Sequence, residues 1–136
     1  MSRILVAAFL CTVILAGCNS ASTDPVTPVS DQNLRAIGDA YGEFTRTKYR
    51  PPKNLEELKP LLKKRGEPDA LLKSENDGEP FVIYWGVDIS PTGKELPVVA
   101  HEKSGRGGNR LVLKGTTIFT MNEEDFQKAP FPASKK

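Results

Sequence analysis

An apolar run of 14 residues near the N-terminus limits which part of this chain can contribute to a folded core. The run covers residues 4–17, contains one polar residue, Thr12, and follows a single cation, Arg3. It is too short to cross about 30 Å of hydrocarbon, for which a helix needs about 20 residues. A positive start, a short apolar core and small residues at its end are typical of a secretory signal peptide. We therefore expect residues 1–17 to be a leader that is removed.

The end of this run, Leu15-Ala16-Gly17-Cys18, resembles the lipobox of bacterial lipoproteins. The resemblance implies that signal peptidase reads Leu15, Ala16 and Gly17, and that Cys18 becomes the first residue, carrying a diacylglyceryl group with fatty acids such as palmitate. The alternative is a buried helix that ends in Gly-Cys by chance. Two or more acyl chains hold a protein firmly on a membrane. We expect a lipid anchor on the extracytoplasmic side of the cell envelope, and Asn19, in place of an inner-membrane retention Asp, favours the outer membrane over the inner membrane.

The region after the leader divides into a tether, one folded domain and a short tail. Residues 19–30 are rich in Ser, Thr and Pro and show no apolar period, so we expect 18–30 to be the lipidated Cys and a flexible tether. Twelve extended residues reach at most about 40 Å. Residues 31–131 predict a single globular domain, and residues 132–136 predict a frayed tail.

Composition limits the partners and chemistry of this domain. The chain has 19 Lys and Arg against 17 Asp and Glu, and a net charge of +2 is too balanced to imply nucleic acid binding. Two Cys and one His leave too few ligands for a His/Cys metal cluster. Because Cys11 lies in the leader, the mature chain keeps one Cys. We expect no cofactor and no metal site, and no modification beyond acylation of Cys18.

An apolar stripe predicts a helix over residues 31–49. The stripe consists of Leu34, Ile37, Tyr41 and Phe44. Ser30 is expected to cap the helix, and Pro51 cannot continue it. Gly38 and Gly42 lie four apart, and they either allow another backbone to pack closely or are weak exposed positions.

A second helical segment is predicted after Asn54. Asn54 and Glu57 match the capping box, in which each side chain bonds the backbone of the other. Pro60 is expected to break or kink this segment. The basic run at 63–65, with Lys59, is expected to be solvated, and lipid head groups are its alternative partner. One more helical turn is predicted near residues 69–73.

Four short strands are predicted in the second half, at residues 81–85, 96–101, 110–114 and 116–121. The separators are short and rich in turn residues, so we expect an antiparallel meander. Asn122 is expected to cap a last short helix. The predicted fold class is therefore α+β: an N-terminal amphipathic helix and short helices, then a small antiparallel sheet of about four strands and a short C-terminal helix.

Three segments, NLRAIGDAYGEFTRTKYRPPKNLEELKPLL, DGEPFVIYWG and VVAHEKSGRGGNRLVLKGTTIFTMNEEDF, resemble the soluble domain of type II secretion pseudopilins and pseudopilin-like proteins. The resemblance covers roughly residues 33–126. It implies an N-terminal helix that leads through a Pro-containing loop to a small antiparallel sheet. Pseudopilins begin with a prepilin leader and a long apolar helix that packs their filaments, whereas here the lipobox stands in its place. We therefore do not expect this chain to enter a filament.

Two segments, residues 101–104 and 104–110, contain residue types that occur in catalytic or phosphate-binding sites. His101, Glu102 and Ser104 could suggest a hydrolase, but neighbours on a strand point to opposite faces, and Ser104 lacks a nucleophile elbow. We expect His101 to be a half-buried packing residue. The Gly-rich segment 104–110 neither opens a helix nor carries the Gly-Lys-Ser/Thr ending, so it predicts a hairpin turn.

Acidic loop residues and paired aromatic residues remain as candidate binding positions. Asp77, Glu79 and Asp88 are acidic, but their spacing matches no calcium loop. Tyr84 and Trp85 are expected to alternate faces on a strand, and the exposed one could anchor an interface, so both are candidate interface residues.

The sequence favours a membrane-anchored envelope lipoprotein that acts as a non-catalytic protein-interaction or scaffold module with a protein partner. Two alternatives stay open. One is an extracytoplasmic small-ligand binder or hydrolase whose site is not recognisable, and the other is an accessory of a type II secretion or pilus-like system.

Overall fold

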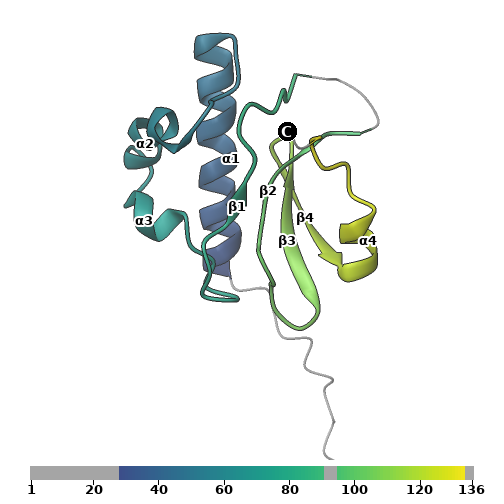
Figure 1. Ribbon diagram of the computed structural model, residues 1–136. Helices are drawn as coiled ribbons and strands as arrows, with labels where there is room; N and C mark the ends of the chain where they lie inside the picture. The colour runs from purple at the N-terminus through teal and green to yellow at the C-terminus, as the bar shows by residue number, and fades with distance from the viewer. Residues whose placement is uncertain (1–27, 91–94, 134–136) are drawn as a thin grey trace, which may run out of the picture.

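A long N-terminal helix lies across one face of a four-stranded antiparallel sheet (Figure 1). The computed structural model describes residues 28–90 and 95–133. The helices are α1 (Pro28–Lys48), α2 (Leu55–Lys63), α3 (Pro68–Leu71) and α4 (Glu123–Gln127). The strands are β1 (Val82–Ile83), β2 (Val98–His101), β3 (Asn109–Lys114) and β4 (Thr117–Asn122), and their order in the sheet is β1-β2-β3-β4. The predicted α+β fold with an antiparallel meander is confirmed.

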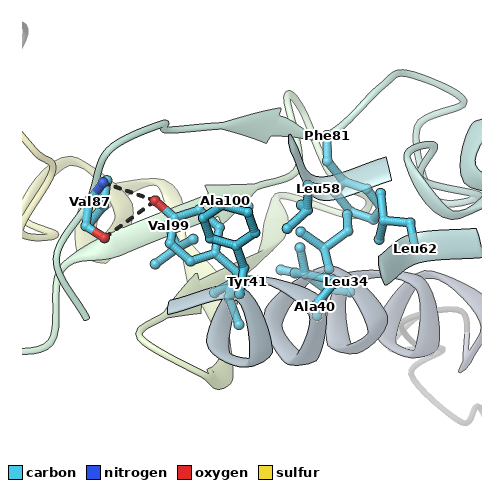
Figure 2. Close-up of a cluster of buried hydrophobic side chains, with 13 residues drawn as sticks. Leu34, Ala40, Tyr41, Leu58, Leu62, Phe81, Val87, Val99 and Ala100 are labelled. Atoms are coloured by element: carbon cyan, nitrogen blue, oxygen red, sulfur yellow. Dashed lines mark hydrogen bonds between the residues drawn. The ribbon is translucent and has the colours of Figure 1, made fainter. Parts of the chain in front are cut away.

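The core lies between the sheet and the predicted apolar stripe of α1 (Figure 2). Leu34, Ile37 and Tyr41 have 0% of their surface exposed. They pack with residues of α2, β2 and β3, namely Leu58, Leu62, Val99, Ala100, Leu111 and Leu113. Burying a side chain of this size contributes about 1.5–3 kcal/mol, so this stripe is the main reason that α1 and the sheet stay together.

The predicted strand at residues 81–85 is wrong in its length, because only Val82 and Ile83 pair with β2. Tyr84 N still donates to Val99 O at 2.8 Å, but Gly86 N donates to Pro52 O at 2.8 Å. That second bond turns the chain away from the sheet and toward the loop after α1. Tyr84 and Trp85 therefore lie after the strand rather than on it.

The buried hydroxyl of Tyr41 holds this turn against α1. The hydroxyl oxygen accepts a hydrogen bond from Val87 N at 2.9 Å. The hydroxyl can also donate to the carbonyl oxygen of Tyr84, at 3.2 Å, or to that of Val87, at 3.3 Å. Figure 2 shows both contacts with Val87. Burial raises the pKa of Tyr41 to about 12, opposed by the hydrogen bond with the Val87 backbone. The position of Trp85 thus depends on a side chain in the middle of α1.

The expected cap at Ser30 is wrong. α1 begins at Pro28 and includes residues 28–30, which we assigned to the tether. Ser30 is fully buried, and its Oγ accepts from Glu75 N at 2.8 Å and Asn76 N at 3.2 Å. The loop after α3 docks on the start of α1 and uses this hydroxyl to satisfy its own N–H groups.

Two expectations for α2 are also corrected. Of the two predicted effects of Pro60, the break is wrong: the helix continues through it, because Leu58 and Leu62 on either side are buried and Glu56, whose carbonyl loses its partner, is exposed. Only half of the capping box forms. Asn54 Oδ1 accepts from Glu57 N at 3.1 Å, but the Glu57 carboxylate accepts from Lys53 N at 2.8 Å instead of from Asn54. The Asn122 cap of α4 is confirmed, since its Oδ1 accepts from Asp125 N at 2.8 Å.

The basic run after α2 is not simply solvated. Arg65 and Lys64 approach the carboxylate of Glu43 on α1 at 2.7 and 3.4 Å. The hydrogen bond from Arg65, with a weaker one from Lys64, lowers the pKa of Glu43. These exposed pairs contribute little to stability, but they fix the outer side of α2 against α1.

Gly38 and Gly42 are buried, so they are not weak exposed positions, but the atoms nearest to them belong to side chains and not to another backbone. A Cβ on Gly38 would lie 3.0 Å from Leu113 Cδ1. A Cβ on Gly42 would meet the end of Arg46 at 3.3 Å and Thr116 Cγ2 at 3.4 Å. Only Gly38 faces a fully buried side chain that has no room to move.

We expect Gly42→Ala and Gly38→Ala to change stability in opposite directions. Gly42→Ala gains up to about 1 kcal/mol of helix propensity and displaces only the flexible end of Arg46. Gly38→Ala overpacks the core at Leu113, which costs about 1–3 kcal/mol and outweighs that gain. Urea unfolding followed by circular dichroism measures both. Equal stabilisation by the two substitutions would contradict a tight approach at Gly38.

Candidate functional site

The two candidate interface residues differ in their surroundings, although both are half-buried. The hydroxyl of Tyr84 lies 3.2 Å from His101 Nε2, and its ring centroid is 6.0 Å from that of Phe131. Trp85 instead lines a surface groove of about 370 Å³ together with Lys53. Tyr84 is therefore engaged inside the domain, and Trp85 is the one that borders a surface depression.

This groove is separated from a larger one by Arg50 and Pro51, which line both. The larger groove has a volume of about 700 Å³. Its other lining residues are Gly42, Thr45, Arg46, Tyr49, Asp88, Ile89, Ser90 and Thr116. We call Tyr49, Arg50 and Pro51 the ridge. It lies where α1 ends, at the opposite end of the helix from Pro28.

The side chain of Arg50 is held in place by Glu57. Its Nη1 and Nη2 donate to the two carboxylate oxygens at 3.0 and 2.7 Å, and its guanidinium lies 5.2 Å from the ring centroid of Phe44. Glu57 also accepts from Lys53 N at 2.8 Å. The hydrogen bonds from Arg50 and then from Lys53 lower the pKa of Glu57 to about 2. The ion pair therefore persists across physiological pH and orders the ridge in the free protein.

Tyr49 has an unusual backbone. Its φ is +55°, and no other non-Gly residue among those described has a positive φ. The left-handed conformation costs about 1–2 kcal/mol for an L-residue, and glycine is the usual choice after a helix. The side chain is 93% exposed, so packing does not repay this cost. A bulky aromatic residue is thus held strained and projecting at the end of α1.

His101 lies on the face of the sheet opposite to α1, under α4 and the C-terminal segment. Its Nδ1 donates to the carbonyl of Glu102 at 2.7 Å, so Nε2 is the atom that accepts from Tyr84. Its ring centroid is 4.8 Å from that of Phe126 and 5.9 Å from that of Phe131. Burial lowers the pKa of His101, and Arg110 nearby lowers it further, while the hydrogen bond to Glu102 opposes them. His101 is a neutral packing residue.

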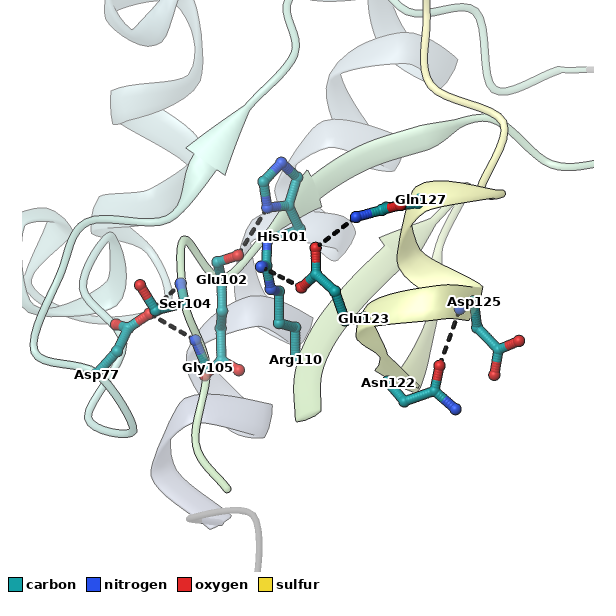
Figure 3. A network of polar contacts seen from close by, with 10 residues as sticks. All are labelled: Asp77, His101, Glu102, Ser104, Gly105, Arg110, Asn122, Glu123, Asp125 and Gln127. Carbon is teal, nitrogen blue, oxygen red and sulfur yellow. Dashed lines mark hydrogen bonds and ion pairs between the residues drawn. The ribbon is translucent and has the colours of Figure 1, made fainter. Parts of the chain in front are cut away.

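Glu102 is a buried carboxylate with every oxygen engaged, and only 1% of its surface is exposed. Oε1 accepts from Ser74 Oγ at 2.6 Å and from Asn76 Nδ2 at 2.7 Å, and Oε2 accepts from Leu111 N at 2.8 Å. It contacts His101 through its backbone carbonyl rather than its carboxylate (Figure 3). The predicted separation of these two side chains is confirmed.

Ser104 does not join a catalytic group either. Ser104 N and Gly105 N both donate to Asp77 Oδ2 at 2.9 Å (Figure 3). Burial raises the pKa of Asp77, but hydrogen bonds from the N–H groups of Ser104, Glu79 and Gly105 lower it more, so the net pKa is lowered. Asp77 is a structural acceptor that ties the loop after α3 to the hairpin between β2 and β3.

The Gly-rich segment is a hairpin turn, as predicted. Gly107 and Gly108 both have positive φ, +61° and +77°, the pattern of the two-residue turns that match strand twist. A Cβ on Gly105 would lie 2.0 Å from Asn109 O, so this position accepts only glycine. The turn connects two strands and does not open a helix.

The other acidic loop residues are dispersed. Glu79 Oε2 lies 3.7 Å from Lys103 Nζ. Asp88 Oδ1 accepts hydrogen bonds from Ser90 N at 2.9 Å and from Ser90 Oγ at 2.6 Å. Within residues 28–90 and 95–133, no three His, Cys, Asp or Glu side chains are grouped so that they could hold a metal ion.

The predicted acylation site lies outside the described residues. This applies to Leu15, Ala16, Gly17 and Cys18, and to residues 19–27 of the tether. Among the helices that the structure does describe, none combines the length and the apolar character that crossing a bilayer requires.

Comparison with known proteins gives no relative. No family model, no curated protein and no solved structure matches the chain. The resemblance to type II secretion pseudopilins therefore stays a prediction.

Sequence reasoning missed the ridge residues Tyr49 and Arg50, and it missed the burial of Glu102. A helix that ends in Tyr-Arg-Pro-Pro without Gly or Asn after its last residue is unusual, and that irregularity could have indicated the ridge. Nothing in the sequence indicated that Glu102 is buried, because its partners lie 9 to 28 residues away along the chain.

We expect stability to fall as pH decreases from 7.5 to 5.5, and His101→Phe to remove this dependence. In the unfolded chain His101 takes up a proton near pH 6.5, whereas in the folded state its lowered pKa keeps it neutral. The contribution of neutral His101 to the free energy of unfolding is therefore fully present above pH 6.5. It is lost as the pH falls below that value, by at most about 1.4 kcal/mol per pH unit. The chain has one His, so His101→Phe removes the only imidazole. The free energy of urea unfolding, measured at pH 7.5 and 5.5, tests this. The same decrease between the two pH values in the unsubstituted chain and in His101→Phe would contradict it.

Proposed function

We propose that this protein is an envelope lipoprotein, anchored by acylated Cys18 and facing away from the cytoplasm, whose folded domain is a non-catalytic protein-binding module. The anchoring part of the proposal is supported by the Leu15–Cys18 sequence and by the Ser/Thr/Pro-rich residues that follow it. The absence of an acidic residue at position 19 supports the outer membrane as the site of anchoring.

The binding part is carried by one observation, the strained and exposed Tyr49. A residue that would be more stable as Gly, and whose ring packs against little of its own domain, points to a role in contact with another molecule. Tyr, Trp and Arg are the residues that most often dominate binding energy at interfaces. All three occur here, because Arg50 adjoins Tyr49 and lines one groove with Trp85.

The position of the ridge suits a tethered protein. α1 contains 21 residues, so the ridge is about 30 Å along the helix from the point where the tether joins at Pro28. The predicted tether thus joins the domain at the end of α1 opposite to the ridge. The Arg50–Glu57 pair orders this surface beforehand, which reduces the entropy lost on binding.

The larger groove favours a second candidate, an extracytoplasmic small-ligand binder. Its volume of about 700 Å³ lies in the range typical of ligand sites. It offers apolar surface at Ile89 and a cation at Arg46. A ligand confined to this groove would not contact Trp85, which lines only the smaller one.

We expect the membrane-extracted protein to have the mass of residues 18–136 plus acyl chains. Cys18→Ser removes the acceptor sulfur, so the substituted chain should keep residues 1–17 and carry no acyl mass. Cys11→Ser is the matched control and should give the wild-type mass, because Cys11 lies in the leader. Intact-mass spectrometry tests all three proteins. A wild-type chain that retains Met1 or lacks acyl mass would contradict the anchor.

We expect Tyr49→Gly to lose partner binding while the domain becomes about 1 kcal/mol more stable, because Gly relieves the left-handed strain. Cross-linking in intact cells, followed by purification, should yield one stoichiometric partner, and Tyr49→Gly and Trp85→Ala should each reduce its yield at least tenfold. Val29→Ala, which alters another exposed apolar side chain at the opposite end of α1, should not. Loss with Tyr49→Gly but not with Trp85→Ala would place the partner on the side of the larger groove, and full retention in both would contradict a binding role for the ridge.

A further inference from the structure

β4 is an edge strand whose outer side has no partner among the described residues. It is the last strand in the order β1-β2-β3-β4 (Figure 1), and residues 117–121 make main-chain hydrogen bonds only with β3 in the part of the chain described. The opposite edge is different. β1 has two residues, and beside it Phe81 N donates to Leu72 O at 2.8 Å.

The register identifies the free groups on this edge. Lys114 pairs with Thr117 across the two-residue loop 115–116, and such a closing pair is hydrogen-bonded. Hydrogen-bonded and non-hydrogen-bonded pairs then alternate along the ladder, so Ile118 and Thr120 direct their N–H and C=O groups away from β3. These groups are spaced to match one antiparallel strand.

The edge lacks the features that keep strands apart. Proteins usually protect an edge strand with a charge, a proline, a bulge or a covering loop. Residues 117–121, Thr-Ile-Phe-Thr-Met, contain no charge, Pro or Gly, and their register with β3 is unbroken. Phe119, at the centre, is 41% exposed. The strand is thus open at its main-chain edge and apolar at its middle.

We propose that β4 pairs antiparallel with β4 of a second copy of this chain, centred on Phe119, to form a two-fold symmetric dimer with one continuous sheet. Ile118 of one copy then exchanges hydrogen bonds with Thr120 of the other. The two Phe119 residues face each other as a close, non-hydrogen-bonded pair on the same face of the sheet. A two-fold interface uses the same patch on both copies, so it closes without leading to fibres.

Charge complementarity favours the second copy and this direction. The start of β4 adjoins Lys114, whose Nζ lies 5.4 Å from the ring centroid of Phe119. The end of β4 leads into the acidic first turn of α4, which contains Glu123, Glu124 and Asp125. Within the domain Glu123 pairs with Arg110 and Glu124 pairs with Lys128, both at the surface. Antiparallel pairing sets the cationic end of one strand beside the acidic turn of the other, whereas parallel pairing would set the two acidic turns together.

Disulfide trapping in the full-length protein, still in its membranes, tests the register. Phe119→Cys places the two Cα atoms about 4.5 Å apart, which suits a disulfide. Thr117→Cys is the matched control. Residue 117 of one copy is opposite residue 121 of the other copy, so the two introduced cysteines lie four residues apart along the strands, about 13 Å. We expect at least tenfold more covalent dimer from Phe119→Cys than from Thr117→Cys or from the unsubstituted chain, which gives the background. Equal trapping at both positions, no trapping, or trapping of a different protein would overturn the proposal.

A second measurement does not depend on cysteine chemistry. Phe119→Lys puts two cations opposite each other, whereas Thr117→Lys puts one beside Met121 of the second copy. In detergent, light scattering should give a dimer for the unsubstituted chain and for Thr117→Lys. Phe119→Lys should keep the same circular dichroism and raise the dimer dissociation constant at least tenfold. A monomeric unsubstituted chain, or a dimer that Phe119→Lys leaves unchanged, would refute the pairing.

Discussion

The hydroxyl of Tyr41 joins the two layers of this domain, and the rest of the surface depends on that contact. It is fully buried in the middle of α1 and hydrogen-bonds the chain just after β1 at Val87. That turn carries Trp85 and returns to Pro52 through Gly86 N. One buried polar atom therefore sets the distance between the end of the helix and the aromatic residue beside it. Both sides of the smaller groove are positioned in this way.

A second buried polar group holds the other end of α1. Glu102, at the end of β2, accepts from Ser74 and Asn76, and Ser30 on α1 accepts from the N–H groups of the same loop. A carboxyl group in the interior is tolerated only when its oxygens are hydrogen-bonded, and here three donors supply those bonds. The network joins helix, loop and strand at the end of the domain where α1 begins. The ridge lies at the far end of the same helix.

The sequence predicted those parts of the structure that depend on neighbouring residues. The apolar stripe of α1, the Asn122 cap and the hairpin at Gly107-Gly108 follow from local spacing and backbone conformation, and they were confirmed. Ser30 was misread as a cap, because its acceptor role depends on a loop about 45 residues away. The strand predicted at 81–85 is longer than the observed β1 for the same reason, because a hydrogen bond from Gly86 N to the distant Pro52 O turns the chain away.

The sequence by itself determined the order of helices and strands and the α+β class, because periodicity and turn residues act over a few positions. The leader and the lipobox stay predictions from the sequence. Only the tertiary structure decided that Arg50 is fixed by Glu57, that Tyr49 is strained and exposed, and that β4 is the edge strand of the sheet within residues 28–90 and 95–133. Each of these depends on which distant segments meet and which are left without a partner. Which distant segments meet is decided by burial and hydrogen bonding across the whole fold, and the local pattern of residues along the chain does not specify it.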